Sequence, residues 1–261
     1  MINPSAAWQL PGTDLILAPG EVHVWRAALP VPAAARARFE RSLSPDEQAR
    51  ASRFHFPRDQ ERFIATRGML RAILGRYASV EPGELRFDYS SFGKPSLAQA
   101  LGGHELRFNL SHSGGLALLG LTRARAIGID VERFRPDLST DKIARSFFSP
   151  REVADLLALP ADARQAAFFA CWTRKEAFVK ARGEGLSFPL DQFDVSLAPG
   201  EPAALLGTRG DPLEASRWTL LELDVGSGYA AALAVEGGLW TLRCLHWPDT
   251  TEPARATGPD A

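Results

Sequence analysis

The chain resembles itself at a regular interval, and this internal repeat constrains its fold more than any other feature of the sequence. The strand-like segment EVHVWRA (21–27) corresponds to AIGIDVE (126–132) at an offset of 105 residues. The segment LSPDE (43–47) corresponds to FSPRE (148–152) at the same offset. In both of the latter segments a serine precedes a proline and an acidic first turn, which predicts a capped helix N-terminus.

Two further matches follow in the same order along the chain. The segment ATRGMLRAIL (65–74) matches WTRKEAFVKA (172–181) at an offset of 107, and both have helical periodicity. The segment SGGLALLGL (113–121) matches SGYAAALAV (227–235) at an offset of 114, and both read as glycine-led apolar strands. Four ordered matches with a slowly growing offset predict two copies of one α+β unit.

We therefore expect an α+β fold that is a pseudodimer of two similar halves, each a small sheet packed on a long helix. The N-terminal half is expected at residues 15–121 and the C-terminal half, which carries the metal site, at residues 122–247. Residues 248–261 have almost no apolar content, which predicts a disordered tail.

Charge and cysteine content restrict the setting in which the protein works. The formal net charge of -1 over 261 residues argues against a nucleic-acid binder held by bulk electrostatics. Cys171 and Cys244 lie in apolar contexts without metal-ligand spacing, so we interpret both as buried thiols in a reducing compartment. The sequence shows neither a signal-peptide pattern nor an apolar stretch of membrane-spanning length. We expect a cytoplasmic monomer with no nucleic-acid or membrane partner.

Two acids interrupt the apolar stretch IGIDVERF. In an extended strand Gly128, Asp130 and Glu132 share one face, and the glycine leaves room for something to approach. Two like charges at this spacing repel unless a cation or proton lies between them. The alternative is a strand whose second face is simply solvated. In the first copy Trp25 and Ala27 occupy the matching positions, so acids in one copy alone favour a single metal site in a duplicated scaffold.

A second pair of charges lies on the apolar stripe of the helix predicted around residues 168–185. Glu176 and Lys180 fall on the same face as Phe169 and Trp172. An ordinary surface pair four residues apart is the alternative, although uncompensated charge on an apolar stripe is costly. Set against the two strand acids, Glu176 would supply a third oxygen ligand for Mg²⁺.

Two turns suit a phosphate ligand. The segment FNLSHSGG (108–115) is a strand end that runs into a Ser/Gly turn, whose N–H groups and hydroxyls can hold an anion. His112 would add charge there, or be a surface histidine in a turn. Lys94 lies in the tight turn FGKP, where a solvated lysine is the ordinary alternative. The sequence contains no nucleophile elbow, Walker loop or dinucleotide fingerprint.

The motifs FNLSHSGG, IGIDVE and WTRKEAFVKARGEGL, in this order and spacing, resemble the 4′-phosphopantetheinyl transferases over about residues 20–235. The two-copy length is similar to the pseudodimeric, surfactin-synthetase-activating type, and not to the short trimeric holo-acyl-carrier-protein synthases. The resemblance implies an enzyme that moves phosphopantetheine from coenzyme A to a serine of an acyl or peptidyl carrier protein and releases 3′,5′-ADP. The carrier would serve fatty acid, polyketide or nonribosomal peptide biosynthesis.

The same resemblance implies roles for individual residues. The Mg²⁺ ligands, with Mn²⁺ as a substitute ion, would be Asp130, Glu132 and Glu176, and the catalytic residues would be Glu176 and Lys180. The contacts with coenzyme A and its phosphates would come from Arg50, Arg62, Lys94, Ser111, His112, Lys175 and Lys180. Glu47 departs from the family pattern, which often has a lysine there.

Two other functions use the same residues. A metal-dependent pyrophosphatase acting on coenzyme A or a related dinucleotide would direct water at phosphorus with the same three acids. A non-catalytic module would bind coenzyme A or carrier domains without chemistry. For a transferase, we expect a local basic patch that faces an acidic carrier helix, and its candidates are Arg133, Arg135, Arg145 and Arg151.

Overall fold

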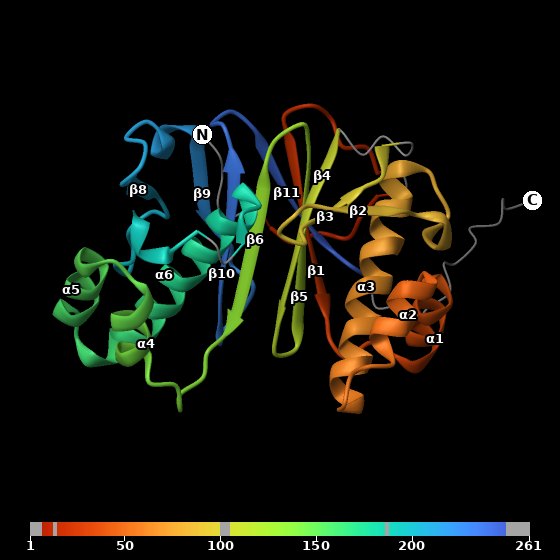
Figure 1. Cartoon of the computed structure of the whole chain (residues 1–261), viewed down its shortest axis with the longest axis horizontal. Coiled ribbons are helices and arrows are strands. Elements are labelled where there is room, and N and C mark those ends of the chain that lie inside the picture. Colours follow the sequence, from red (N-terminus) through yellow and green to blue (C-terminus); the bar gives the residue numbers. More distant parts are fainter. Residues whose placement is uncertain (1–6, 13–14, 100–104, 186–187, 249–261) are drawn as a thin grey trace, which may run out of the picture.

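The same succession of elements occurs twice in the computed structural model, which describes residues 7–12, 15–99, 105–185 and 188–248 (Figure 1). The first series is β1 (Glu21–Ala28), α1 (Ala33–Ser42), α2 (Pro45–Ala51), α3 (Pro57–Ala78), β2 (Phe87–Tyr89), β3 (Pro95–Leu97), β4 (Leu106–Ser113) and β5 (Leu116–Arg123). The second series is β6 (Ile127–Arg133), α4 (Thr140–Phe147), α5 (Pro150–Ala158), α6 (Ala161–Arg182), β7 (Phe193–Val195), β8 (Leu205–Thr208), β9 (Trp218–Glu222) and β10 (Tyr229–Glu236). The chain then forms β11 (Thr241–His246). The predicted tail lies, apart from residue 248, outside the described residues.

The two main sheets have equivalent strand orders. One sheet has the order β11-β1-β5-β4 and the other the order β6-β10-β9, so the triplets β1-β5-β4 and β6-β10-β9 correspond strand by strand. All pairings within these triplets are antiparallel. The predicted α+β pseudodimer is therefore confirmed. The extra strand β11 follows the second series in the chain but pairs parallel to β1, which ties the two series together.

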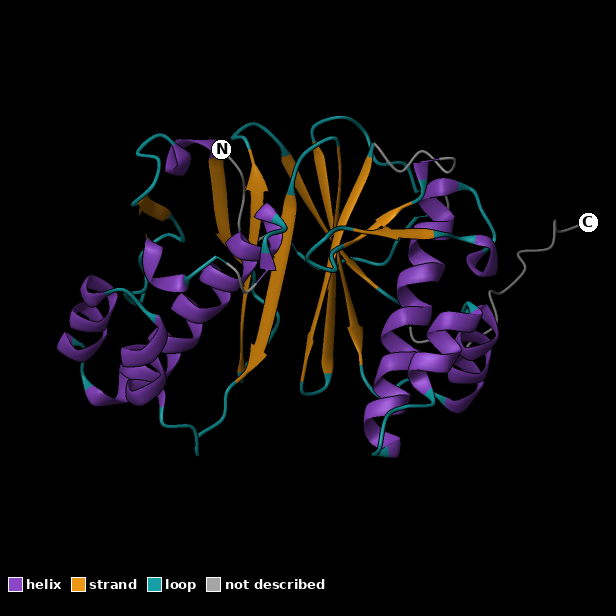
Figure 2. Cartoon of the chain, viewed as in Figure 1, coloured by secondary structure: helices purple, strands orange, loops and turns teal. Residues whose placement is uncertain are grey.

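The layers run from helices through two sheets to helices. Figure 2 shows the strands gathered in the middle, with one group of helices on each outer side. One apolar cluster lies between the four-stranded sheet and the first helix group, and another between the three-stranded sheet and α6. A third cluster lies between the sheets and includes Val24, Leu118, Ile129 and Leu233. The face of β6 opposite Ile129 is therefore the one that meets α6, and it carries Asp130.

The long helices of the two halves correspond in a different register from the one that the sequence match predicts. Both α3 and α6 have 22 residues, and each ends at a residue in the left-handed conformation, Ser79 and Gly183, which gives an offset of 104. The predicted offset of 107 is wrong by almost one helical turn. At the observed offset Arg71 corresponds to Lys175, and each pairs with the buried glutamate of the helix start in its own half.

The last strand match is also displaced, by one residue. Trp25 pairs with Leu119 across β1 and β5, and Asp130 pairs with Ala232 across β6 and β10. If Trp25 and Asp130 correspond, Leu119 corresponds to Ala232 at an offset of 113, not 114. A slip of one residue in a strand exchanges its two faces, so the observed register is the one that keeps the helix-facing residues together.

Candidate functional site

Strand β6 and helix α6 meet backbone to backbone beside the predicted acids. A Cβ atom placed on Gly128 would lie 2.0 Å from the Ala177 carbonyl oxygen and 2.3 Å from the Ala181 nitrogen. Only glycine permits this approach. The close contact is what brings Lys180, the residue before Ala181, within reach of Asp130. The room that the sequence pattern predicts beside the acids is thus filled by the helix.

Asp130 is the most constrained carboxylate of the site. Its side chain is almost fully buried, and its Oδ1 atom accepts hydrogen bonds from the Lys180 ammonium (2.6 Å) and the Ser111 hydroxyl (2.9 Å). Its Oδ2 atom is buried and has no hydrogen-bond partner among the described residues. A buried carboxylate oxygen without a partner carries a desolvation cost, so this atom is a ready acceptor for an incoming ligand.

Glu132 and Glu176 complete a cluster of acids whose charges disfavour one another. Burial raises the pKa of Glu132, and the charge of Asp130 adds to this, whereas the hydroxyl of Ser113 opposes it from 2.7 Å. Burial also raises the pKa of Glu176, with further contributions from Asp130 and Glu132 and an opposing one from Lys180. A cation between these groups would relieve both the repulsion and the desolvation.

The donor chemistry of this cluster fits a hard divalent ion. All three side chains offer carboxylate oxygens, which Mg²⁺ and Mn²⁺ prefer, and the free Oδ2 atom of Asp130 is unclaimed. Within the described part of the chain, however, no three His, Cys, Asp or Glu side chains are arranged around a common point as they stand. Instead Lys180 supplies the countercharge to Asp130.

Basic side chains surround the open end of the acid cluster. A hollow of about 650 Å³ is lined by Glu132 together with Arg58 and Arg62 from α3 and Arg133 and Arg135 from the end of β6. Arg62 also donates to the carbonyl of Gly114 at 3.1 Å. An anionic ligand that enters this hollow would meet these guanidinium groups, which we call the arginine rim, and, of the acid cluster, the carboxylate of Glu132.

The other predicted ligand contacts are placed in different ways. The His112 side chain is exposed beside the hollow, and partial desolvation together with the charges of Arg62 and Lys180 lowers its pKa. Arg50 is exposed on α2, where its guanidinium lies 5.4 Å from the ring centroid of Phe63. Ser111 is buried and bound to Asp130.

Lys94 is more enclosed than a solvated turn lysine would be. Its ammonium donates to the carbonyls of Lys180 (2.5 Å), Ile127 (3.1 Å) and Ala181 (3.1 Å), at the C-terminal end of α6 and the start of β6. Burial, with a smaller contribution from Arg107, lowers its pKa to about 8. In this structure it therefore links the β2–β3 segment of the first half to the helix that carries Glu176.

Lys175 does not lie at the site, and its expected contact with coenzyme A needs correction. Its side chain is 0% exposed, and the ammonium bonds to Glu152 (2.7 Å) and to the carbonyls of Leu190 and Phe193 (both 2.6 Å). Three protein acceptors use all of its donors. The motif places Lys175 next to Glu176 in sequence, but on a helix neighbouring residues point about 100° apart.

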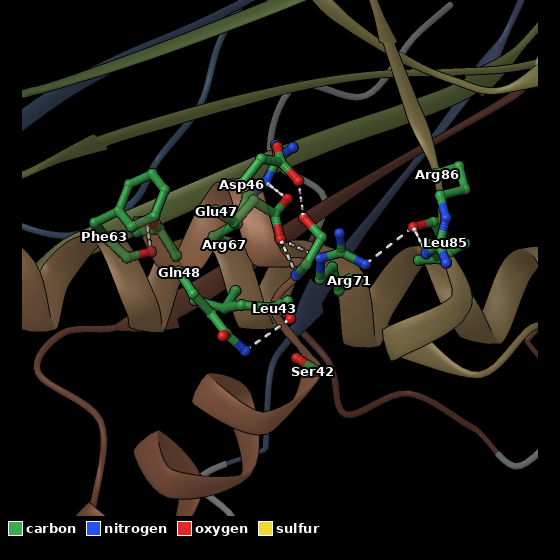
Figure 3. Close-up of polar contacts among 12 residues, drawn as sticks. Ser42, Leu43, Asp46, Glu47, Gln48, Phe63, Arg67, Arg71, Leu85 and Arg86 are labelled. Atoms are coloured by element: carbon green, nitrogen blue, oxygen red, sulfur yellow. Dashed lines mark hydrogen bonds and ion pairs between the residues drawn. The ribbon is translucent and has the colours of Figure 1, made fainter. Parts of the chain in front are cut away.

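Glu47 has an equally internal position, which explains its departure from the family pattern. Figure 3 shows its carboxylate between Arg67 and Arg71, and the distance from Arg71 Nε to Oε2 is 2.6 Å. Although burial alone would raise the pKa of Glu47, the hydrogen bond from Arg71 and the charge of Arg67 hold it below its usual value. Glu47 thus stabilises the first half, as Glu152 stabilises the second.

Two residues beside the acids escaped the sequence analysis. Ser113 donates to Glu132, and the Asn109 side chain accepts from the backbone N–H of Ile129 at 2.8 Å. The signal was the spacing of Asn109, Ser111 and Ser113 at every second position of one strand, which places all three on one face.

Comparison with known proteins gives matches over both halves. The profile of the 4′-phosphopantetheinyl transferase superfamily matches residues 126–234, and that of 4′-phosphopantetheinyl transferase, N-terminal, matches residues 32–122. The 4′-phosphopantetheinyl transferase HetI of Nostoc sp. (strain PCC 7120 / SAG 25.82 / UTEX 2576) is 43% identical over 240 residues, which cover 92% of this chain and 98% of that protein. The 4′-phosphopantetheinyl transferase Sfp of Bacillus subtilis (strain 168) is 35% identical over 160 residues, which cover 61% of this chain and 69% of that protein.

Proposed function

The chain belongs to the 4′-phosphopantetheinyl transferase superfamily, and on that premise we propose that it transfers the phosphopantetheine group of coenzyme A to a serine of an apo carrier protein. The observation that carries the proposal is the cluster of Asp130, Glu132, Glu176 and Lys180, of which Glu132 lines a hollow together with arginine side chains. Acids that can hold a divalent ion, next to cations that can hold phosphate, suit a pyrophosphate substrate.

The reaction exchanges one phosphorus–oxygen bond for another. The serine oxygen of the carrier bonds to the phosphorus that bears pantetheine, and the bond from that phosphorus to the bridging oxygen breaks. The electron pair leaves with 3′,5′-ADP, and the serine gives up its proton. A divalent ion held by Asp130, Glu132 and Glu176 would supply neutralisation of the charge that builds on the pyrophosphate.

Two side chains of α6 take the remaining roles. Glu176 accepts the serine proton, because its carboxylate lies beside the other two acids on the face of α6 that meets β6. Lys180, one helical turn further, donates to the phosphate oxygens of the departing nucleotide once these compete for its bond with Asp130. Both groups come from one rigid helix, so their spacing is fixed by its geometry.

The carrier protein is proposed to dock at the arginine rim. Arg133 and Arg135 are exposed and line the hollow directly above Glu132. Of the other two candidates, Arg145 lies near the end of α4, and Arg151 on α5 faces Asp155 at 3.8 Å. Positive charge on both sides of the hollow would steer an acidic carrier surface toward the acids and away from the rest of a nearly neutral protein.

Function in the cytoplasm as a monomer, without nucleic acid, stays a prediction. Of the helices that the structure describes, none combines the length and the apolar character needed to cross a membrane.

The test is to incubate the protein with coenzyme A, MgCl₂ and an apo carrier protein, and to measure the intact mass of the carrier and the release of 3′,5′-ADP. We expect the carrier to gain the mass of one phosphopantetheinyl group for each nucleotide released, and we expect no cleavage of coenzyme A without carrier. Cleavage without carrier at an unchanged rate would overturn the proposal in favour of a pyrophosphatase. Binding of coenzyme A without either product would indicate a non-catalytic module.

A further inference from the structure

Strand β6 has one edge that none of the strands in the described part of the chain covers with its backbone. On one side it pairs with β10, and on the other side it faces β4, which belongs to the other sheet. An uncovered strand edge leaves its N–H groups without partners, and proteins avoid this. Here the side chains of β4, and not the backbone of β4, accept hydrogen bonds from the backbone N–H groups of β6.

Three polar side chains of β4 accept from three N–H groups of β6 in register. The Asn109 amide oxygen accepts from Ile129 (2.8 Å), the Ser111 hydroxyl from Val131 (3.4 Å) and the Ser113 hydroxyl from Arg133 (3.1 Å). Each step moves two residues along both strands, so the three contacts form a side-chain ladder between the halves. We use this name for these three hydrogen bonds.

Two members of the side-chain ladder also hold the acids. A serine hydroxyl has a single proton to donate, and it can accept two hydrogen bonds. Ser113 accepts from the N–H of Arg133 and directs its proton to the Oε2 atom of Glu132 at 2.7 Å. Ser111 likewise donates to Asp130 at 2.9 Å. The orientation of both carboxylates is therefore set from the opposite half of the molecule.

We propose that Ser113 is a positioning residue, which locks Glu132 in its metal-binding orientation because its hydroxyl is itself fixed by the side-chain ladder. This inference rests on the proposed function, since it assigns the metal to the acid cluster. Partners that orient a metal ligand typically contribute ten- to a hundredfold to metal affinity. Ser113 is the better test case than Ser111, because the Ser111 hydroxyl also contacts Lys180 at 3.2 Å and so has more than one role.

Three variants separate the roles of the hydroxyl. Ser113→Ala removes it, and Ser113→Thr keeps it on a side chain that suits a strand. Ser52→Ala is the matched control, because its exposed hydroxyl bonds only within its own helix region, to the Ala49 carbonyl at 2.9 Å. The full chain is used throughout, and thermal melting confirms that each variant is folded.

The first measurement is amide hydrogen exchange at Arg133 in metal-free protein, which tests the side-chain ladder without reference to any function. We expect Ser113→Ala to speed exchange about tenfold, the value of one ordinary hydrogen bond, and Ser113→Thr and Ser52→Ala to leave it unchanged. Equal exchange in wild type and Ser113→Ala would overturn the side-chain ladder.

The second measurement is the dissociation constant of Mn²⁺, followed by the loss of the free-ion electron paramagnetic resonance signal with coenzyme A present. We expect Ser113→Ala to weaken binding by at least about tenfold and Ser113→Thr to restore it. Faster exchange at Arg133 with unchanged Mn²⁺ affinity would show that the hydroxyl only joins the halves, and would overturn the positioning role. If wild type itself binds no Mn²⁺, the metal site of the proposed function fails and the positioning role fails with it, whereas the exchange result still decides the side-chain ladder.

Discussion

At corresponding places in the two halves, Asp130 lies on β6 and Trp25 lies on β1. Lys180 bonds to Asp130 at 2.6 Å, and at the same position of the other helix Arg76 lies 5.9 Å from the ring centroid of Trp25. Trp25 is 0% exposed and packs in the core of its half. The same arrangement of strand and helix, which we call the frame, thus holds a charged cluster in the second half and a buried tryptophan in the first.

The same contrast continues around this position. Gly128 lets α6 touch β6, but the corresponding residue of the first half is His23, whose Nδ1 atom lies 2.6 Å from the hydroxyl of Tyr77. The Trp25 indole also donates to this hydroxyl, at 3.0 Å. Tyr77 thus serves both the Nδ1 atom of His23 and the indole of Trp25, although the Nε2 atom of His23, like the Oδ2 atom of Asp130, is buried without a hydrogen-bond partner among the described residues. The first half keeps the same strand and helix without acids at these positions, which supports the chemical role that we propose for Asp130 and Glu132.

The halves do share one charged feature, the buried glutamate of the second helix start. Glu47 is held by Arg67 and Arg71, and Glu152 by Lys175. Each glutamate also accepts from the backbone N–H of the serine three residues earlier, at 3.0 Å in both halves. Because this ion pair is present in both halves, we assign it to the fold, whereas the chemical role is proposed for the acids that only the second half has.

The largest expected effect is on the rate of transfer and comes from Glu176. Glu176→Gln should slow transfer on the order of 10³-fold, because it removes both a proton acceptor and an oxygen ligand. Stability should not fall, since the change also removes a charge that Asp130 and Glu132 repel. Steady-state kinetics and thermal melting measure the two quantities. Ala72 is the residue of α3 that corresponds to Glu176, and Ala72→Ser should leave the transfer rate unchanged. A comparable loss of rate in this variant would contradict the assignment of the chemistry to the second half.

The next effect is on stability and should be equal in the two halves. Glu47→Gln leaves the buried Arg71 without its counter-ion, and Glu152→Gln does the same to the buried Lys175. Loss of one partner of a buried ion pair costs about 3–5 kcal/mol in the free energy of unfolding. Denaturant titration measures this, with the transfer rate of the folded fraction unchanged. If Glu47→Gln left stability intact while raising KM for coenzyme A, Glu47 would belong to the ligand site after all.

These expectations also show what the sequence could and could not predict. The alternation in IGIDVERF was enough to place Asp130 and Glu132 on one face, because strand geometry fixes the period. The Thr-Arg pair that both long helices contain led to the wrong alignment of the two helices. Thr66 and Thr173 are the same residue type, but they do not occupy equivalent positions in α3 and α6. Helix ends and strand pairing decide such a register, and neither is visible in a local match.

Contacts between distant segments account for the rest. The motif alone placed Lys175 at the ligand, but its burial depends on Glu152 and on carbonyls that follow the helix. Lys94 was expected in a tight turn as a contact for coenzyme A, and it lies against carbonyls 33 and 86 residues away. Neither position follows from spacing, because that of Lys175 depends on packing within the second half and that of Lys94 on the contact between the two halves.

A smaller effect concerns the pH dependence of stability and comes from the first half. Burial, with a contribution from Arg243, lowers the pKa of His23 from 6.5 to about 4, so the unfolded chain binds an additional proton between these values. Stability should therefore fall as the pH drops from about 6.5 to about 4, by about 3 kcal/mol from this group. Denaturant titrations at a series of pH values should show that the free energy of unfolding of wild type falls by about that much more across this range than that of His23→Gln. An identical loss in both proteins would mean that His23 is not held neutral.

The smallest expected effect concerns the arginine rim. Reversing Arg133 and Arg135 to Glu should raise KM for the carrier about tenfold and flatten its salt dependence, because local charge steers association. Carrier titrations at two salt concentrations measure this, and coenzyme A affinity serves as the control. An unchanged KM for the carrier would show that the carrier does not dock at Arg133 and Arg135.

The contrast between Asp130 and Trp25 is tested most directly by measuring the transfer rate and the free energy of unfolding for the pair Asp130→Asn and Trp25→Phe. We expect Asp130→Asn to lower kcat/KM on the order of 10³-fold with stability within about 1 kcal/mol of wild type. We expect Trp25→Phe to lose about 1–3 kcal/mol of stability, from lost volume and the lost hydrogen bond to Tyr77, with kcat/KM of the folded protein unchanged. A folded Trp25→Phe variant without activity, or an active Asp130→Asn variant, would contradict the assignment of chemistry to one half of a duplicated frame.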